Sequence, residues 1–316
     1  MIIDEDSTEW ALGNQSAALA PLSRAEAAHL VRLSLEAAAA RSLQGWYDGA
    51  GALVLQAGPG FTAGSDGRFE AGLTNLARFV AGLRPDHWPR VVGEHFDRLA
   101  HTMRHGPPPL PADPQHELLQ RLVPKESLEP RLLGSAPEFV PGLLSVPATT
   151  TDGTITMYFD PVTDLGLTWA EAESCGRRNL RSLTDTVTFA EYEGTLVAMI
   201  SGSDFAASRA LVLDTVLRES LHVENPRYGV LAAMPVRDLL LVHVITDLSV
   251  IPALGMMLNL AGRSHANEPG PLSPWIYLVT PDGWHLATRP SNAPNPGLSS
   301  HFITLLHELD RDSSWQ

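Results

Sequence analysis

The dipeptide Arg237-Asp238 is the part of the sequence best suited to chemistry. It follows Pro235-Val236 and stands between two apolar runs, YGVLAAM and LLLVHVI. An arginine presents a planar set of donors that matches a carboxylate or a phosphate, and a neighbouring aspartate can orient it. The same four residues also fit a tight turn, in which proline fixes the first corner and aspartate bonds to its own backbone. The sequence leaves both interpretations open.

Two histidines, His222 and His243, lie on either side of this dipeptide along the chain. Together with Arg237 and Asp238 they are the candidate binding residues. Spacing alone assembles no set of nucleophile, base and orienting group from them. Ser203 lacks the G-x-S-x-G pattern of a nucleophile elbow. The sequence therefore names candidate binding residues and leaves the catalytic residues unknown.

The stretch LVLQAGPGFTAGSDG, residues 53–67, has the form of a strand that runs into a glycine-rich loop. A phosphate-binding P-loop needs G-x-x-x-x-G-K-[ST], yet no lysine or arginine lies in this loop, and Pro59 removes a backbone donor. A dinucleotide fingerprint fails as well, because no βαβ unit follows. We therefore expect a turn, and no cofactor.

Histidine spacing raises the possibility of a metal site. His101 and His105 are four residues apart on an expected helix, so both rings could reach one ion. A zinc helix of the H-E-x-x-H type needs glutamate after the first histidine, where Thr102 stands. At His307 the second ligand position holds Arg311. We expect histidines at a surface or interface, and no metal site.

Composition limits the possible partners and compartments. The 316 residues are 44% hydrophobic and 18% charged, with a formal net charge of −14, which describes a globular chain that nucleic acid or an anionic membrane would repel. The acidic start MIIDEDSTEW is unlike a signal peptide, and no apolar run reaches the ~20 residues of a membrane span. The single cysteine, Cys175, excludes a disulfide within the chain. A cytoplasmic protein is expected, with a protein as its possible partner and its oligomeric state open.

Residues 21–105 are predicted to form a small, mostly helical N-terminal region after a flexible acidic tail, residues 1–20. Ser23 and Glu26 form a capping box at the first helix. The expected elements are a helix over 23–43, a strand over 52–56, and helices over 69–83 and 88–105. The proline-rich run GPPPLPADP then predicts a linker, residues 106–149, with a short helix over 115–123.

Residues 150–316 are predicted to form the main domain, of the α+β class. A helix followed by a hairpin recurs three times, with Thr168 and Glu171 as a second capping box and Glu193-Gly194 as a hairpin turn. The expected elements are a strand over 155–160, helices over 168–183, 203–220 and 247–262, and hairpins over 186–202, 228–245 and 275–289. These repeated helix-hairpin units predict an antiparallel sheet covered by helices.

Five segments resemble the YtpQ-like family of uncharacterised bacterial proteins: FEAGLTNLARFV, TWAEAESCGRRNL, ASRALVLD, AAMPVRDLLLV and PLSPWIYLV. The resemblance spans residues 50–290 and is most specific at Pro235-Val236-Arg237-Asp238 and at Asn179-Leu180. It departs at Gly176, which replaces the alanine of an A-x-x-N-L helix. The resemblance implies a bacterial, cytoplasmic α+β protein of unknown activity and brings no catalytic residue.

No intact catalytic motif is present, so the sequence favours a non-enzymatic binding or regulatory protein that acts through protein contacts. The alternative is a hydrolase or nucleotide-handling enzyme with a site around Arg237, Asp238 and His243. The two hypotheses predict different surfaces. An enzyme should place Arg237 in a concave pocket. A binding protein should show an exposed apolar patch or an unpaired sheet edge.

Overall fold

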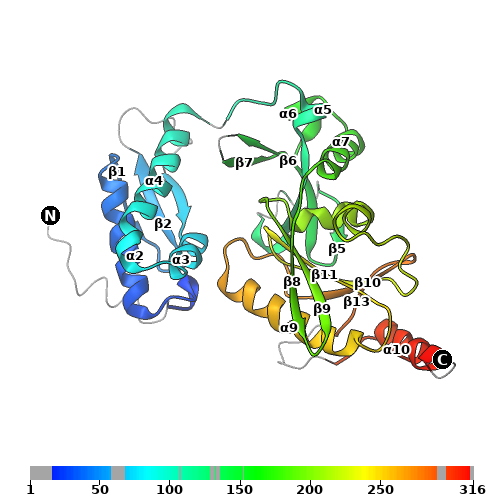
Figure 1. The fold of residues 1–316 in the computed structure, drawn as a ribbon. Coiled ribbons are helices and arrows are strands. Elements are labelled where there is room, and N and C mark those ends of the chain that lie inside the picture. Colours follow the sequence, from blue (N-terminus) through cyan, green and yellow to red (C-terminus); the bar gives the residue numbers. More distant parts are fainter. Residues whose placement is uncertain are drawn as a thin grey trace. The chain divides into compact units, whose positions relative to one another are not determined.

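The computed structural model describes residues 16–57, 68–106, 108–128, 132, 136–151, 153–289 and 297–313. The glycine-rich loop that follows residue 57 and the acidic tail before residue 16 lie outside these ranges. The chain forms two compact units (Figure 1). Unit 1 comprises Met1–Pro109 and Ala266–Pro269, and unit 2 comprises Leu110–His265 and Gly270–Gln316.

Unit 1 packs helices on one face of a three-stranded antiparallel sheet of order β1-β2-β3. Its main elements are α2 (Arg24–Ala39), β1 (Leu43–Tyr47), β2 (Ala52–Ala57), β3 (Arg68–Gly72), α3 (Thr74–Ala81) and α4 (Trp88–His105). Along β2, Leu53 and Leu55 are fully buried, whereas Val54 between them is only half-buried. This alternation places one face of the sheet in the core with Trp88 and Phe96 of α4.

The predicted helix over 88–105 and the capping box of Ser23 and Glu26 are confirmed. Two boundaries were wrong. The first helix ends at Ala39, and β1 follows it. The helix expected over 69–83 begins only at Thr74, because residues 68–72 pair with β2 as strand β3. The composition of FEAG is typical of a helix start, but these residues pair with the open edge of β2 and therefore form a strand.

Unit 2 is built on a six-stranded antiparallel sheet of order β13-β12-β10-β11-β9-β8. The strands are β8 (Thr186–Tyr192), β9 (Thr195–Ser201), β10 (Val230–Val236), β11 (Leu239–Val244), β12 (Ile276–Thr280) and β13 (Gly283–Leu286). Each predicted hairpin is present, and the three join side by side in one sheet. The α+β class and the antiparallel sheet of helix-hairpin units are thereby confirmed.

Both faces of this sheet are covered. One face packs against α9 (Val250–Asn267) and α10 (Ser300–Ser313), with Leu231 and Leu241 between sheet and helices (Figure 1). The other face carries Ile200 and Val242 and packs against the segment 207–220. Here the structure differs from the single helix expected over 203–220. The segment is a 3-10 helix η6 (Ala207–Val212), a short α8 (Leu213–Thr215) and a π-helical turn η7 (Val216–Ser220).

The segment 106–149, expected to be a linker, contributes strands to unit 2. A four-stranded sheet joins β4 (Leu119–Pro124), β5 (Glu138–Val140), β6 (Leu143–Thr151) and β7 (Thr154–Met157). The predicted helix over 115–123 was wrong, because helical turns stop at Glu117 and β4 follows. The helix α7 (Trp169–Arg181) packs on β4 and opens with the predicted capping box of Thr168 and Glu171. Within the described ranges, no helix combines the length and apolarity that crossing a membrane requires.

Candidate functional site

The Arg237-Asp238 dipeptide forms the tip of the β10–β11 hairpin, since Val236 pairs with Leu239. The backbone N–H of Arg237 donates to the carbonyl of Gly270 at 2.9 Å, and its own carbonyl accepts from the Ala207 N–H at 3.1 Å. The turn interpretation expected Pro235 at the first corner of the turn, and this was wrong. Pro235 lies in β10, in the β-bulge between Ala233 and Val236, where a missing N–H disturbs the ladder least.

The side chain of Arg237 is half-buried against Gly270, and its Nε lies 3.4 Å from Oδ1 of Asp204. That Nε makes no hydrogen bond within the described part of the chain. Arg121 of β4 is the cationic neighbour of Arg237. The guanidinium carbon of Arg121 lies over the ring of Phe205, 5.3 Å from the ring centroid. Burial, and secondarily the charge of Arg237, lower the pKa of Arg121 to about 10. The pair of arginines is therefore partly neutralised by Asp204 and packed into the protein.

His243 is buried near the far end of β11, with 6% of its surface exposed. Its Nδ1 lies 2.8 Å from the carbonyl of Leu196, so Nδ1 carries the proton and donates. The buried Nε2 has no hydrogen-bond partner among the residues that the structure describes. Burial lowers the pKa of His243, although the bond to Leu196 and the charge of Asp247 act in the opposite direction. The ring is therefore held neutral.

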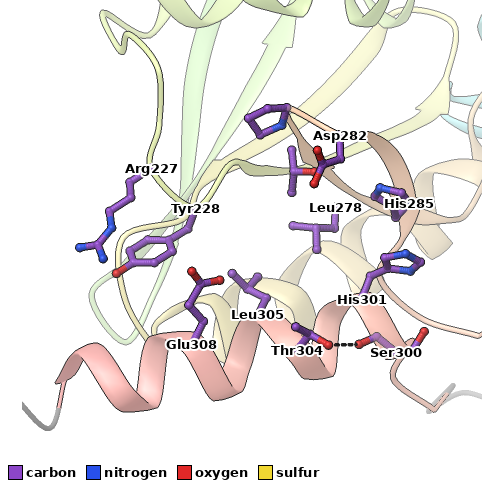
Figure 2. A pocket seen from close by; sticks show the side chains of 12 residues that line it. Arg227, Tyr228, Leu278, Asp282, His285, Ser300, His301, Thr304, Leu305 and Glu308 are labelled. Carbon is purple, nitrogen blue, oxygen red and sulfur yellow. Dashed lines mark hydrogen bonds between the residues drawn. The ribbon is translucent and has the colours of Figure 1, made fainter.

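The four candidate binding residues do not converge. His243 follows Arg237 by six residues along the extended chain of β11, and six residues of strand span about 20 Å. Asp238 is exposed at the hairpin tip. His222 is exposed in the loop after η7 and has a positive φ of 55°. The cavity of about 440 Å³ in unit 2 is lined by other residues (Figure 2).

The β8–β9 hairpin has a feature that motif reasoning missed. β8 forms one edge of the six-stranded sheet, and among the strands that the structure describes it pairs only with β9. Three large apolar side chains on this hairpin face solvent: Phe189 is 59% exposed, Tyr192 56% and Leu196 48%. Phe189 and Leu196 lie on the same face, diagonally across the two strands. The signal in the sequence was the segment TFAEYE, in which alternate side chains form a fully apolar face on neither side of the strand.

The hairpin register shows which backbone groups of β8 are free. Glu193 and Gly194 both have positive φ, 50° and 76°, which defines a two-residue type I′ turn. The closing pair Tyr192–Thr195 is then hydrogen-bonded, and every second pair along an antiparallel ladder is not. Val187, Phe189 and Glu191 therefore direct their N–H and C=O groups away from β9, toward the open edge.

The charge at this edge is negative. Glu191 and Glu193 are exposed beside the apolar side chains. A hydrogen bond to Glu193 raises the pKa of the Tyr192 hydroxyl, and the glutamate charge adds to that effect. An incoming segment thus meets apolar contacts, an unpaired ladder and carboxylates.

Across the described ranges, no three or more His, Cys, Asp or Glu side chains gather in a way that could hold a metal ion. Comparison of the chain with protein-family models, with curated proteins and with solved structures finds no match.

Proposed function

We propose that the protein is a non-enzymatic binding protein that captures an extended segment of a partner protein along β8. The observation that carries this proposal is the edge itself: β8 is seven residues long, regular in register, and exposed together with Phe189, Tyr192 and Leu196. Addition of a strand to such an edge is an established mode of peptide recognition. Backbone hydrogen bonds supply affinity, and alternate side chains supply selectivity.

The opposite edge of the sheet supports this reading by contrast. β13 has only four residues, and all of them are half-buried. Short or covered edge strands prevent unwanted pairing. β8 has neither protection: five of its seven residues are exposed, and no bulge interrupts its pairing with β9.

The partner segment is expected to be extended, apolar at alternate positions and basic. Phe189 and Leu196 offer one apolar contact area, and Glu191 and Glu193 favour lysine or arginine near the turn. The net charge of −14 favours the same sign of partner.

Selection from a peptide-display library tests the proposal directly. The wild-type protein should enrich extended, basic-apolar peptides. Glu191→Pro removes one outward N–H without removing a bond to β9, so the hairpin should remain folded while binding falls by about tenfold or more. Phe189→Ser removes the apolar contact and should weaken the same peptides.

The matched control is Val162→Ser, which removes an apolar side chain of similar exposure, 58%, from helix α6 (Pro161–Leu165). It should bind the selected peptides like the wild type. Circular dichroism and thermal unfolding establish that all variants are folded. If peptides bind the Glu191→Pro and Phe189→Ser variants as tightly as the wild type, β8 is not the binding edge.

A further inference from the structure

A cavity of about 440 Å³ in unit 2 opens between α10, the β12–β13 turn and the residues that precede β10 (Figure 2). It lies apart from the β8–β9 hairpin, because β12 and β13 form the other end of the sheet. Leu278 and Leu305 are buried and form its apolar floor. A small organic molecule with an apolar body fits a space of this size and lining.

Aromatic rings form two of the walls. His285 and His301 stack with ring centroids 4.0 Å apart and an interplanar angle of 14°. Tyr228 lies across the opening from them (Figure 2). The guanidinium of Arg227 sits 4.8 Å from the centroid of the Tyr228 ring, so this ring already accepts a cation on one face.

The charges around the cavity are not balanced. Arg227 is held by Asp312 at 2.5 Å, and the Tyr228 hydroxyl donates to the same carboxylate. The positive charge at the rim is thereby compensated. Asp282 and Glu308 also line the cavity. Neither side-chain carboxylate makes a hydrogen bond or an ion pair with another residue that the structure describes. Two carboxylates are therefore available to a ligand.

We propose that this cavity binds an organic cation, a small amine or guanidine with an apolar stem. The cationic end would pair with Asp282 or Glu308, and the stem would lie on Leu278 and Leu305 against the aromatic walls. An anionic ligand would instead face two uncompensated carboxylates. The site is independent of strand capture at β8, and either can hold without the other.

Calorimetric titration with three probes tests the proposal: n-butylguanidinium, n-butylammonium and n-butyltrimethylammonium, each of which has one cationic end and an apolar stem. At least one should bind the intact protein with a Kd of about 1 mM or tighter. N-butylurea, which resembles the guanidine end but is neutral, should not bind. Failure of all three cations at about 5 mM would overturn the proposal.

Variants locate the binding. Glu308→Gln and Asp282→Asn keep the size of the side chain and remove its charge, so each should weaken the bound probe and the double variant should weaken it by about tenfold or more. Glu224→Gln is the matched control, since Glu224 is an exposed acid of unit 2 outside the cavity. The NMR signals of His285 and His301 should shift on titration. Equal affinity of the double variant and the wild type would show that the cation binds elsewhere, contrary to the proposal.

Discussion

Arg209 and Asp185 form the most deeply buried ion pair in the described part of the chain, with side chains 1% and 4% exposed. Two guanidinium nitrogens reach the two carboxylate oxygens, at 3.0 and 2.8 Å. A third nitrogen donates to the carbonyl of Leu180, and the Ser220 hydroxyl donates to Asp185. The pair ties the 3-10 and π-helical segment to the start of β8.

Replacement of one partner should be costly, because it leaves an uncompensated charge inside the protein. Arg209→Met is expected to lower the free energy of unfolding by about 3–5 kcal/mol. The double variant Arg209→Met/Asp185→Leu should recover most of that loss. Urea denaturation measures all three proteins. A double variant that is no more stable than Arg209→Met would contradict the coupling.

His243 makes stability depend on pH. Burial holds its folded-state pKa below the ordinary value of 6.5, so the unfolded chain binds the proton more readily. The contribution of His243 is present above about pH 6.5 and is lost as the pH falls below it. Between pH 7.5 and pH 5.5 the free energy of unfolding should fall less in His243→Leu than in the wild type.

His95 in α4 has a pKa that burial lowers in the same direction, followed by the charge of Arg98. Both proteins in the comparison keep His95, so its effect cancels. NMR titration of the imidazole signals provides an independent check. An equal loss of stability in both proteins, or a His243 pKa above 6.5, would contradict the prediction.

At the level of elements, α7 approaches β4 unusually closely at Gly176. A Cβ added there would lie 2.9 Å from the backbone nitrogen of Gln120. Asn179, one turn further on, donates to the carbonyls of Gln115 and Leu118. Gly176 thus has a packing role: the helix lies directly on the strand backbone.

Gly176→Ala is therefore expected to lower stability by about 1–3 kcal/mol, although alanine is the better helix former. The matched control is Gly262→Ala in α9, where an added Cβ meets no atom within 4 Å. That variant should gain up to about 1 kcal/mol. Thermal unfolding of the two variants compares the signs. A stabilised Gly176→Ala would show that α7 can move away from β4.

Sequence patterns predicted the elements whose signal is local. Trp88–His105 carries its own apolar stripe and proline start, and the three hairpins carry turn residues such as Glu193-Gly194. The elements that were missed depend on distant partners. β4 spaces its apolar residues as a helix would, and it is a strand because β6 pairs with it.

Pro147 shows why β6 was hidden. A proline argues against a central strand because it lacks an N–H. In β6 the carbonyl of Pro147 accepts a hydrogen bond from the Tyr158 N–H, on the side of the strand away from β4. On that same side, β5 pairs with residues 143 and 144. The missing N–H faces the gap between β5 and β7, which the sequence does not reveal. The candidate site was hidden similarly, since an edge strand is defined by which strands do not join it.

On the scale of the whole molecule, each unit has its own hydrophobic core. Unit 1 is organised around Leu30, Trp88 and Phe96, and unit 2 around both faces of the six-stranded sheet. A fragment of residues 110–316 should therefore fold without residues 1–109. Circular dichroism and differential scanning calorimetry should show strand-rich secondary structure and one cooperative transition. A fragment without a cooperative transition would mean that unit 2 needs unit 1.

The order of strands in the sheet has a consequence for synthesis on the ribosome. The hairpins emerge as β8–β9, then β10–β11, then β12–β13. Each new hairpin pairs with the edge that the previous hairpin left open: β11 joins β9, and β12 joins β10. Growth therefore proceeds in one direction, and β8 occupies the starting edge from the first hairpin onward. If a partner pairs with β8 as proposed, it would find its docking strand in place while the nascent chain is still being translated.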